Sequence, residues 1–201
     1  MPTTLAQHVH TGDTSMPRLT PLPGDLAIWI FIFAELLVFG VFFISFAIVK
    51  SQNALLFHTG QQLLHTGWGL INTLLLITSS YCMAEAVARR QSAGPLQQQY
   101  GWLAAAMLLG LCFIAMKLHE FHDDAQHGIT LSSSLFALFY LSMTFFHFMH
   151  VLLGLVILAV VGWRLQPNSA PEDHALETAA SYWHMVDLVW IILFMLVYVL
   201  P

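Results

Sequence analysis

Five long apolar segments, separated by short polar ones, dominate the pattern of hydrophobic and polar positions along the chain. Crossing a bilayer takes roughly 20 predominantly apolar residues in a helix, and each segment comes close to or exceeds that length. We therefore predict an all-α membrane protein, a bundle of five transmembrane helices. In this interpretation residues 1–25 form a polar N-terminal tail and residues 26–201 form the membrane domain. The predicted spans cover about residues 26–49, 68–88, 101–118, 132–163 and 180–200.

The composition agrees with a membrane protein. Hydrophobic residues make up 58% of the chain and charged residues 8%, whereas about 25% of the residues in an ordinary soluble domain are charged. The connecting segments are too short to hold a soluble domain. The net charge of −5 comes without a run of like charges, so the sequence indicates no nucleic-acid partner.

The few cationic residues predict an orientation. With five spans, the N-terminal tail and the loops after the second and fourth spans lie on one side, which carries Arg18, Arg89, Arg90 and Arg164. The opposite side has Lys50 and Lys117, each placed at a predicted helix end from which its ammonium group can reach water. Because cytoplasmic loops are enriched in Lys and Arg, we predict a bacterial inner-membrane protein with a cytoplasmic N-terminus and a periplasmic C-terminus.

An acidic residue, Glu35, lies about ten residues into the first predicted span, near the bilayer centre. An unpaired carboxylate at that depth is strongly disfavoured. Glu35 is either a structural carboxyl bonded to a neighbouring helix or a group that takes part in proton transfer, ion transport or contact with a partner subunit. Its best partner is an imidazole or hydroxyl on another helix, and His147 lies at a comparable depth.

Two histidines, His147 and His150, lie three residues apart in the fourth span and project from one helical face. Paired imidazoles in a helix bundle can bind haem or a metal ion. A bis-histidine haem needs ligands from facing helices, however, and the only other histidine well inside a span is His184. The chain also lacks an HExxH or CxxCH pattern. We therefore expect interhelical hydrogen bonds and no haem, copper or iron bound to this chain.

Small polar and glycine residues recur within the spans. Asn72, Thr73, Ser79 and Ser80 in the second span predict contact with a neighbouring helix through modest hydrogen bonds. Close approach of helices is likewise predicted at Gly40, Gly110, Gly154 and Gly162.

Glu120 follows the third predicted span in the segment Lys117-Leu-His-Glu-Phe-His-Asp-Asp. Taken alone, this charged segment predicts a helix end exposed to water, without a functional site.

The fifth span holds two polar groups, His184 and Asp187, in otherwise apolar surroundings. A carboxylate at membrane depth costs roughly 2.5–3.5 kcal/mol on insertion scales. The two residues are three apart and so share a helical face, which we expect to point into the bundle and bond to other spans. They belong to the pattern Tyr182-Trp183-His184-x-Val186-Asp187-x-Val189-Trp190.

This pattern resembles the closing signature of subunit III of the heme–copper respiratory oxidases. The resemblance extends in order over all five spans, from about Gly24 to the C-terminus. Glu35 takes the position of a buried carboxyl within a Phe-rich first span. The later matches are Asn72-Thr73 with Ser79-Ser80 in the second span, Glu120-Phe121 after the third, and His147-x-x-His150-Val151-x-x-Gly154 in the fourth.

The resemblance implies a structural subunit that contains no catalytic centre of its own. Such a subunit packs on catalytic subunit I, where the haem and copper (or iron) reside. It holds phospholipid at that contact, supports proton uptake and protects the active site during turnover. The five-helix form resembles the bacterial subunit III of quinol-oxidase type, and also the subunit III-like proteins associated with nitric oxide reductase.

One departure from the family pattern concerns Phe146 and Phe148, which flank the first histidine of the fourth span where the family usually has small residues. Two benzyl groups cannot allow the same backbone approach, so we expect different packing there. This departure favours the alternative of a nitric-oxide-reductase-associated protein. A third hypothesis is a stand-alone proton channel or transporter that uses Glu35, His147, His184 and Asp187.

Overall fold

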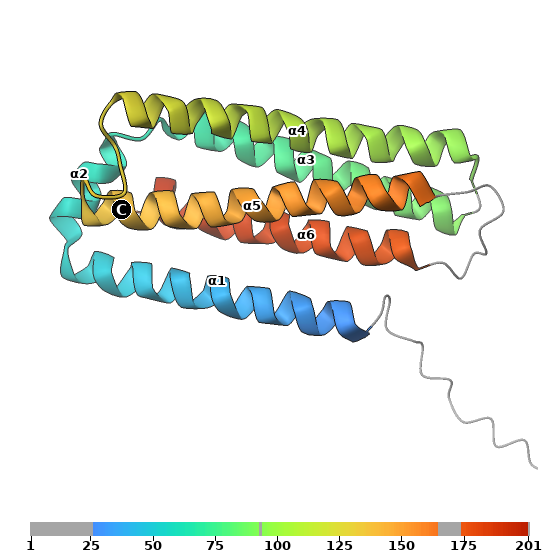
Figure 1. Ribbon diagram of the computed structural model, residues 1–201, viewed down its shortest axis with the longest axis horizontal. Coiled ribbons are helices and arrows are strands. Elements are labelled where there is room, and N and C mark those ends of the chain that lie inside the picture. The colour runs from blue at the N-terminus through green and yellow to red at the C-terminus, as the bar shows by residue number, and fades with distance from the viewer. Residues whose placement is uncertain (1–25, 93, 165–173, 201) are drawn as a thin grey trace, which may run out of the picture.

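The computed structural model describes residues 26–92, 94–164 and 174–200, and these residues form helices joined by short turns, without a strand. The predicted N-terminal tail lies outside the described residues. Figure 1 shows the long helices side by side along one axis. In chain order the elements are α1 (Leu26–Gln52), α2 (Ala54–Gln62), α3 (Thr66–Gln91), α4 (Leu96–Gln126), α5 (Leu135–Arg164), α6 (Ala175–Phe194) and the π-helical turn η1 (Met195–Val199).

The predicted fold class is confirmed. Within the described residues, five helices are long and apolar enough to cross a membrane, with α6 and η1 together forming the fifth. The chain is therefore a multi-pass membrane protein. The turn between α3 and α4 lies at one end of the bundle, whereas α2, the α4–α5 turn and the C-terminus lie at the other (Figure 1).

The structure differs from the sequence-based prediction in an additional short helix and in several helix boundaries. The polar link expected between the first two spans contains the short helix α2, which is anchored by the buried ring of Phe57. That ring packs between Phe46 and Phe136, at centroid distances of 5.2 and 5.7 Å. Only one large apolar side chain of α2 points inward, so its sequence shows little helical periodicity.

Helix α4 runs on to Gln126, beyond the predicted end of the third span near Leu118. Two residues after the helix, Gly128 turns the chain with a φ of 76°, in the left-handed region that glycine adopts without strain. The fourth span was predicted to begin near residue 132, but α5 begins at Leu135, after three serines. The hydroxyl of Ser134 accepts a hydrogen bond from the Ala137 amide at 3.0 Å.

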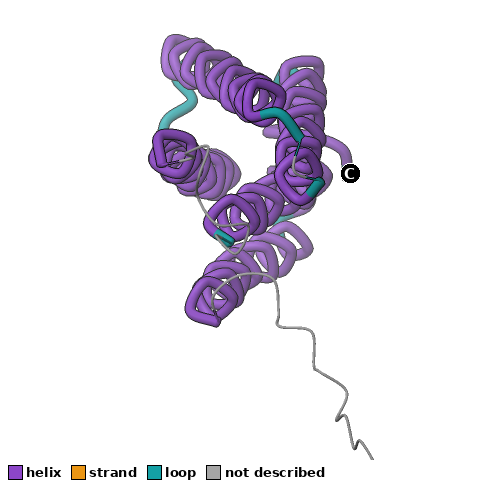
Figure 2. Tube along the Cα trace, turned by 90° about the vertical axis from the view of Figure 1, so that its right-hand side faces the viewer, coloured by secondary structure: helices purple, strands orange, loops and turns teal. Residues whose placement is uncertain are grey.

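The bundle is built around α6, and α1 lies at its edge. In the most apolar stretch of each span, 61% of the residues are buried for the span that contains α6 and 17% for α1. Helix α6 contacts α1, α3 and α5. Figure 2, turned by 90° from Figure 1, shows α1 at the margin of the helix group. Most of the α1 surface therefore remains free for lipid or a partner.

Polar side chains join α6 to α3. The indole nitrogen of Trp183 donates to Ser79 Oγ at 3.1 Å, and that of Trp190 donates to Thr73 Oγ1 at 3.0 Å. Ser79 in turn donates to the carbonyl oxygen of Ala106 on α4 at 2.7 Å. The predicted interhelical contacts of Thr73 and Ser79 are thus confirmed.

The indole of Trp183 explains two of the glycines. A Cβ at Gly110 of α4 would lie 2.9 Å from this ring, and one at Gly154 of α5 would lie 2.8 Å from it. Both glycines therefore make room for the indole, and a Cβ at Gly162 would likewise meet Leu103 at 3.0 Å. The prediction for Gly40 was wrong, because no described atom lies within 4 Å of the position of its Cβ.

We predict that Gly110→Ala destabilises the protein by about 1–3 kcal/mol, since the added methyl group overpacks against the Trp183 ring. Gly101→Ala is the matched control on the same helix, because its Cβ would meet no described atom within 4 Å. Thermal unfolding of both purified variants measures the difference. Equal stability of the two would contradict the account of Trp183 packing.

Candidate functional site

Polar side chains gather in three groups inside the bundle. The lysine cluster consists of Lys117, Glu120, Asp124, Tyr140 and Tyr198. The carboxyl–imidazole pair consists of Glu35 and His150, and the serine–histidine group consists of Ser80, His184 and Asp187.

The lysine cluster is a continuous hydrogen-bonded network. Lys117 Nζ donates to Glu120 Oε2 at 2.9 Å and to the Tyr198 hydroxyl at 3.0 Å. The Tyr198 hydroxyl donates to Glu120 Oε1 at 2.6 Å. The Tyr140 hydroxyl lies 2.9 Å from both Glu120 Oε1 and Asp124 Oδ2. A phenol has one proton and cannot donate to both carboxylates. Both contacts of Tyr140 are hydrogen bonds only if one of the two carboxyl groups is protonated and donates to the phenol oxygen.

Lys117 is fully buried. Its ammonium group lies 5.2–5.6 Å from the ring centroids of Phe121, Tyr140, Trp190 and Tyr198. Such distances allow cation–π attraction, which is strengthened where water is excluded. The predicted exposure of this lysine was wrong, because α4 continues past it and the side chain points inward to Glu120.

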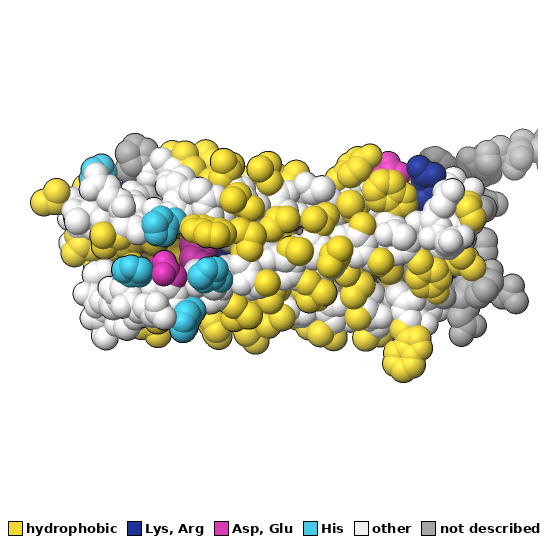
Figure 3. Space-filling view, turned by 90° about the horizontal axis from the view of Figure 1, so that it is seen from above, with side chains coloured by type: hydrophobic (Ala, Val, Ile, Leu, Met, Phe, Trp, Pro, Cys, Tyr) yellow, Lys and Arg dark blue, Asp and Glu magenta, His cyan; other side chains and the backbone are white. Residues whose placement is uncertain are grey.

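Glu120 was also wrongly predicted to lie at a water-exposed helix end, since only 8% of its side chain is exposed. Together with Asp124 it lines a cavity of about 180 Å³. Figure 3 shows histidine and acidic side chains gathered at this end of the bundle, on a surface that is otherwise largely apolar. The cavity joins the lysine cluster to the outside, and its other lining residues are His65, Trp68, Met116, His119 and Asp123.

The carboxyl–imidazole pair joins α1 to α5. His150 Nε2 lies 2.9 Å from Glu35 Oε2, and His150 Nδ1 lies 2.8 Å from the carbonyl oxygen of Phe146. A carbonyl oxygen only accepts, so Nδ1 carries a hydrogen and donates it. One proton then lies between Nε2 and the carboxyl group. The predicted imidazole partner of Glu35 is thus present, but it is His150 and not His147.

His147 is fully buried, and neither ring nitrogen has a hydrogen-bond partner among the described residues. Its ring packs among those of Phe39, Phe113 and Trp190, at centroid distances of 6.4, 5.9 and 5.1 Å. The predicted interhelical hydrogen bonding therefore holds for His150 but not for His147. The Phe39 ring lies beside both histidines, but they share no hydrogen-bond partner among the described residues.

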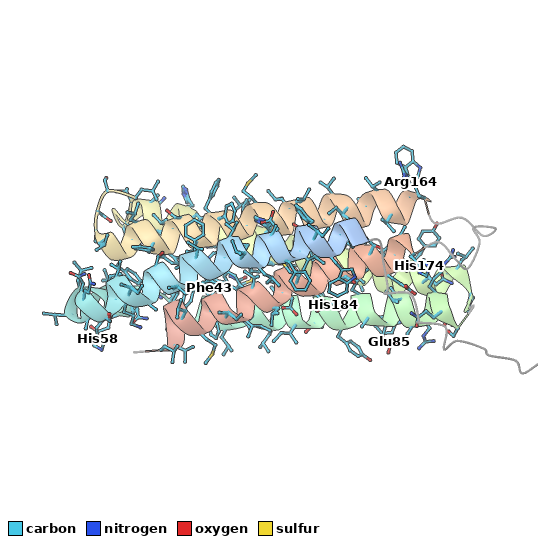
Figure 4. All side chains as sticks on the ribbon, turned by 90° about the horizontal axis from the view of Figure 1, so that it is seen from below. Phe43, His58, Glu85, Arg164, His174 and His184 are labelled. Carbon is cyan, nitrogen blue, oxygen red and sulfur yellow. The ribbon has the colours of Figure 1, made fainter. Side chains whose placement is uncertain are left out.

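The serine–histidine group joins α6 to α3. His184 Nδ1 lies 2.5 Å from Ser80 Oγ, and the Asp187 carboxyl lies near the same hydroxyl. The prediction of a hydrogen bond to another span is confirmed for His184. The second carboxyl oxygen of Asp187, Oδ1, is buried and has no bonding partner in the described parts of the chain. Figure 4 shows His184 nearer the bundle end that carries Glu85 and His174 than the end that carries His58.

Asn72 is buried in α3, as expected for a residue at a helix contact. Its amide nitrogen and oxygen, however, bond to none of the residues that the structure describes. The hydrogen bonds predicted for this residue are therefore not found.

The family model described as cytochrome c oxidase subunit III matches residues 22–200 of this chain. The chain belongs to that family. The match covers all five membrane-spanning segments and every residue of the three polar groups.

Curated relatives agree with this assignment. A cytochrome c oxidase subunit 3 from Synechocystis sp. is 38% identical over 135 residues, which is 65% of this chain and 55% of that protein. The cytochrome c oxidase subunit 3 of Thermostichus vulcanus is 30% identical over 180 residues, covering 87% of this chain and 86% of the relative. The quinol oxidase subunit 3 of Bacillus subtilis is 28% identical over 203 residues, covering 96% and 97%.

The two phenylalanines that flank His147 fill interhelical space. Phe146 packs against Phe39 and Phe42 of α1, at centroid distances of 5.2 and 5.6 Å. Phe148 is buried and lies 5.9 Å from the ring of Phe121 on α4. Both neighbours of His147 thus pack through aromatic rings rather than by close backbone approach.

Sequence reasoning missed Tyr140, Tyr198 and Asp124 as members of a polar group. The tyrosines lie in apolar runs, where they look like ordinary aromatic core residues. The available signal was the i, i+3 spacing of Lys117 and Glu120, which places opposite charges on one helical face.

We predict that Lys117→Met destabilises the assembled protein by about 3–5 kcal/mol, because it leaves the buried Glu120 carboxyl without its charge partner. Glu120→Gln added to this variant should restore part of the loss. The amount of folded protein and its thermal stability provide the readout, with His122→Ala on the exposed face of α4 as control. A single Lys117→Met variant as stable as this control would refute the paired role.

Proposed function

We propose that this chain is the non-catalytic subunit III of a bacterial heme–copper oxidase. In this proposal it packs on catalytic subunit I and supports the stability and proton uptake of that subunit. The observation that carries the proposal is the family match over residues 22–200. The names of the relatives, which include cytochrome c oxidase and quinol oxidase subunits, support it.

The bonding of His150 and His184 within the spans supports a structural role. Both nitrogens of His150 are engaged by protein groups, and His184 is bonded to Ser80 through Nδ1. Hydrogen bonds between spans are what a scaffold needs to fix its helices. We accordingly assign the haem and copper of the complex to the partner subunit.

The exposed apolar face of α1 supports contact with a partner and with phospholipid. Side chains on this face point away from the rest of the bundle, so in the membrane they meet either acyl chains or another protein. They include Ile30, Phe33, Leu37, Val41 and Ile44.

The proposed location is the bacterial inner membrane, with the N-terminus in the cytoplasm. Arg89, Arg90 and Arg164 lie at the bundle end that holds the α3–α4 turn. At the other end, Lys117 is buried in its cluster and Lys50 is bonded to the carbonyl oxygen of Leu200. The excess of cations on the first side supports a cytoplasmic assignment for it.

Nitric oxide reductase is the second candidate partner. This alternative rests on the family resemblance and on Phe146 and Phe148, whereas the relatives named above are oxidase subunits. A stand-alone proton channel or transporter has no comparable support.

Affinity purification of the tagged chain in mild detergent tests the proposal. We expect a catalytic subunit with haem and copper to co-purify in a stable complex that consumes oxygen. If a partner with haem and non-haem iron co-purifies instead, the complex is a nitric oxide reductase and not an oxidase. Purification of the chain by itself, with proton flux after reconstitution into vesicles, would contradict both assignments.

A further inference from the structure

Tyr140 lies between two carboxyl groups at the end of the bundle that holds α2. Its hydroxyl oxygen is 2.9 Å from Glu120 Oε1 and 2.9 Å from Asp124 Oδ2. A phenol can donate to one of these oxygens and must accept a hydrogen bond at the other contact. Since an ionised carboxylate only accepts, these two bonds require a proton on one of the carboxyl groups.

The neighbours of the two carboxyl groups determine which one is protonated. Glu120 accepts from the Lys117 ammonium group at 2.9 Å and from the Tyr198 hydroxyl at 2.6 Å. Bonds of this kind, above all the one from an ammonium group, favour the ionised carboxylate. Among the described residues, the Tyr140 hydroxyl is the one side-chain hydrogen-bond partner of Asp124. The proton therefore belongs to Asp124.

A proton on Asp124 gives every hydroxyl of the cluster a consistent set of bonds. The Asp124 acid donates to the Tyr140 oxygen, and the Tyr140 hydroxyl donates to Glu120. Tyr198 accepts from Lys117 at 3.0 Å and donates to Glu120. The charges balance as well, because those of Lys117 and Glu120 cancel and Asp124 is neutral. Without the proton, a buried network would carry an uncompensated negative charge, which is costly away from water.

The cavity gives this proton a way in and out. Asp124 and Glu120 both line its wall. Because Asp124 itself borders the cavity, a proton from water there needs no relay through the apolar interior. In loading, a hydronium ion gives one proton to the Asp124 carboxylate, and unloading returns that proton to water.

The position of Asp124 gives its proton a structural effect. The residue lies in the last turn of α4, and its backbone carbonyl oxygen accepts from the Ile129 amide at 2.9 Å where the chain turns towards α5. Its side chain meets Tyr140 of α5, whose hydroxyl lies 3.4 Å from that of Tyr198 on η1. Without the proton, Tyr140 can bond to only one of the two carboxylates, and a second negative charge lies beside Glu120.

We propose that Asp124 is a proton-binding site loaded from the cavity, and that its proton holds α4 against α5 and η1. The bundle end that contains α2 then packs most firmly when Asp124 is protonated, and it loosens as the pH at that end rises. This response depends on this chain alone and is independent of the proposed partner.

Several charged and titratable groups surround this carboxyl group and influence its proton. They are Lys117, Glu120 and Asp123 of α4, Tyr140 of α5, Tyr198 of η1, and His65 and His119 on the cavity wall.

Infrared spectroscopy of the purified full-length chain locates the proton. We expect Asp124→Asn to remove a protonated-carboxyl band. Tyr140→Phe should shift the same band, because it takes away the oxygen to which the acid donates. Asp123→Asn is the matched control on the same cavity, since the Asp123 side chain is 39% exposed and should contribute an ionised-carboxylate band. Loss of only ionised-carboxylate bands in Asp124→Asn would overturn the assignment, as would loss of the same protonated band in the control.

Reversible unfolding of the chain in mixed micelles over a series of pH values tests the structural effect. Asparagine at position 124 cannot ionise, and its amide group can donate to Tyr140 as the acid does. Where the carboxyl band disappears with rising pH, the folded chain binds more protons than the unfolded chain. The folded-to-unfolded ratio of the parent should therefore fall relative to that of Asp124→Asn, by up to about tenfold per pH unit.

Two further variants complete the series. Asp123→Asn should keep the pH dependence of the parent chain. Asp124→Ser also has a neutral donor that cannot ionise, so it should lose the pH dependence as Asp124→Asn does, and it serves if that variant fails to fold. Parallel pH curves of the parent and either Asp124 variant would overturn the proposal, because they would show that Asp124 takes up no proton on folding.

Discussion

The absence of water inside the bilayer governs this structure. A polar side chain at membrane depth must find its hydrogen-bond partner within the protein, and here the partners lie on other helices. Trp183 and Trp190 of α6 bond to Ser79 and Thr73 of α3, and Ser79 bonds onward to α4. Apolar packing alone would leave the arrangement of the helices less defined, because lipid chains are as apolar as leucine. The polar bonds place α6 at the centre, and α1, with fewer of them, stays at the edge.

The same constraint explains the C-terminal end of the bundle. The π-helical turn η1 interrupts the regular backbone ladder, as such turns often do near functional positions. Side chains from distant segments donate hydrogen bonds to the carbonyl groups of this turn. Gln61 of α2 bonds to the carbonyl oxygens of Val197 and Leu200, at 2.8 and 2.9 Å. Lys50 of α1 bonds to the carbonyl oxygen of Leu200 at 2.8 Å. These bonds fix the turn that carries Tyr198 into the lysine cluster. Helix α2, which the hydrophobic pattern did not reveal, thus helps to position the most polar part of the interior.

The sequence allowed the five spans and the inward face of His184 and Asp187 to be predicted, because these depend on segment length and helical periodicity. The family could be predicted from the residue pattern between Tyr182 and Trp190. The sequence did not show whether His147 or His150 is the partner of Glu35, since both lie on one face of α5. Only the packing of α1 against α5 determines which imidazole meets the carboxyl group. The burial of Lys117 depends on α4 continuing to Gln126, and charged residues near a span end normally indicate water. Tyr140 and Tyr198 could not be separated from core aromatics because their role requires a carboxyl group on another helix.

A double-mutant cycle on Trp183 and Ser79 tests most directly whether polar bonds between helices hold this bundle together. Trp183→Phe, Ser79→Ala and the double variant are compared with the parent protein by reversible unfolding in mixed micelles. Our account predicts a coupling energy of about 1 kcal/mol between the two positions, within the range of interhelical hydrogen bonds in membranes. Purely additive effects of the two substitutions would show that the bond contributes nothing and that apolar packing alone sets the arrangement.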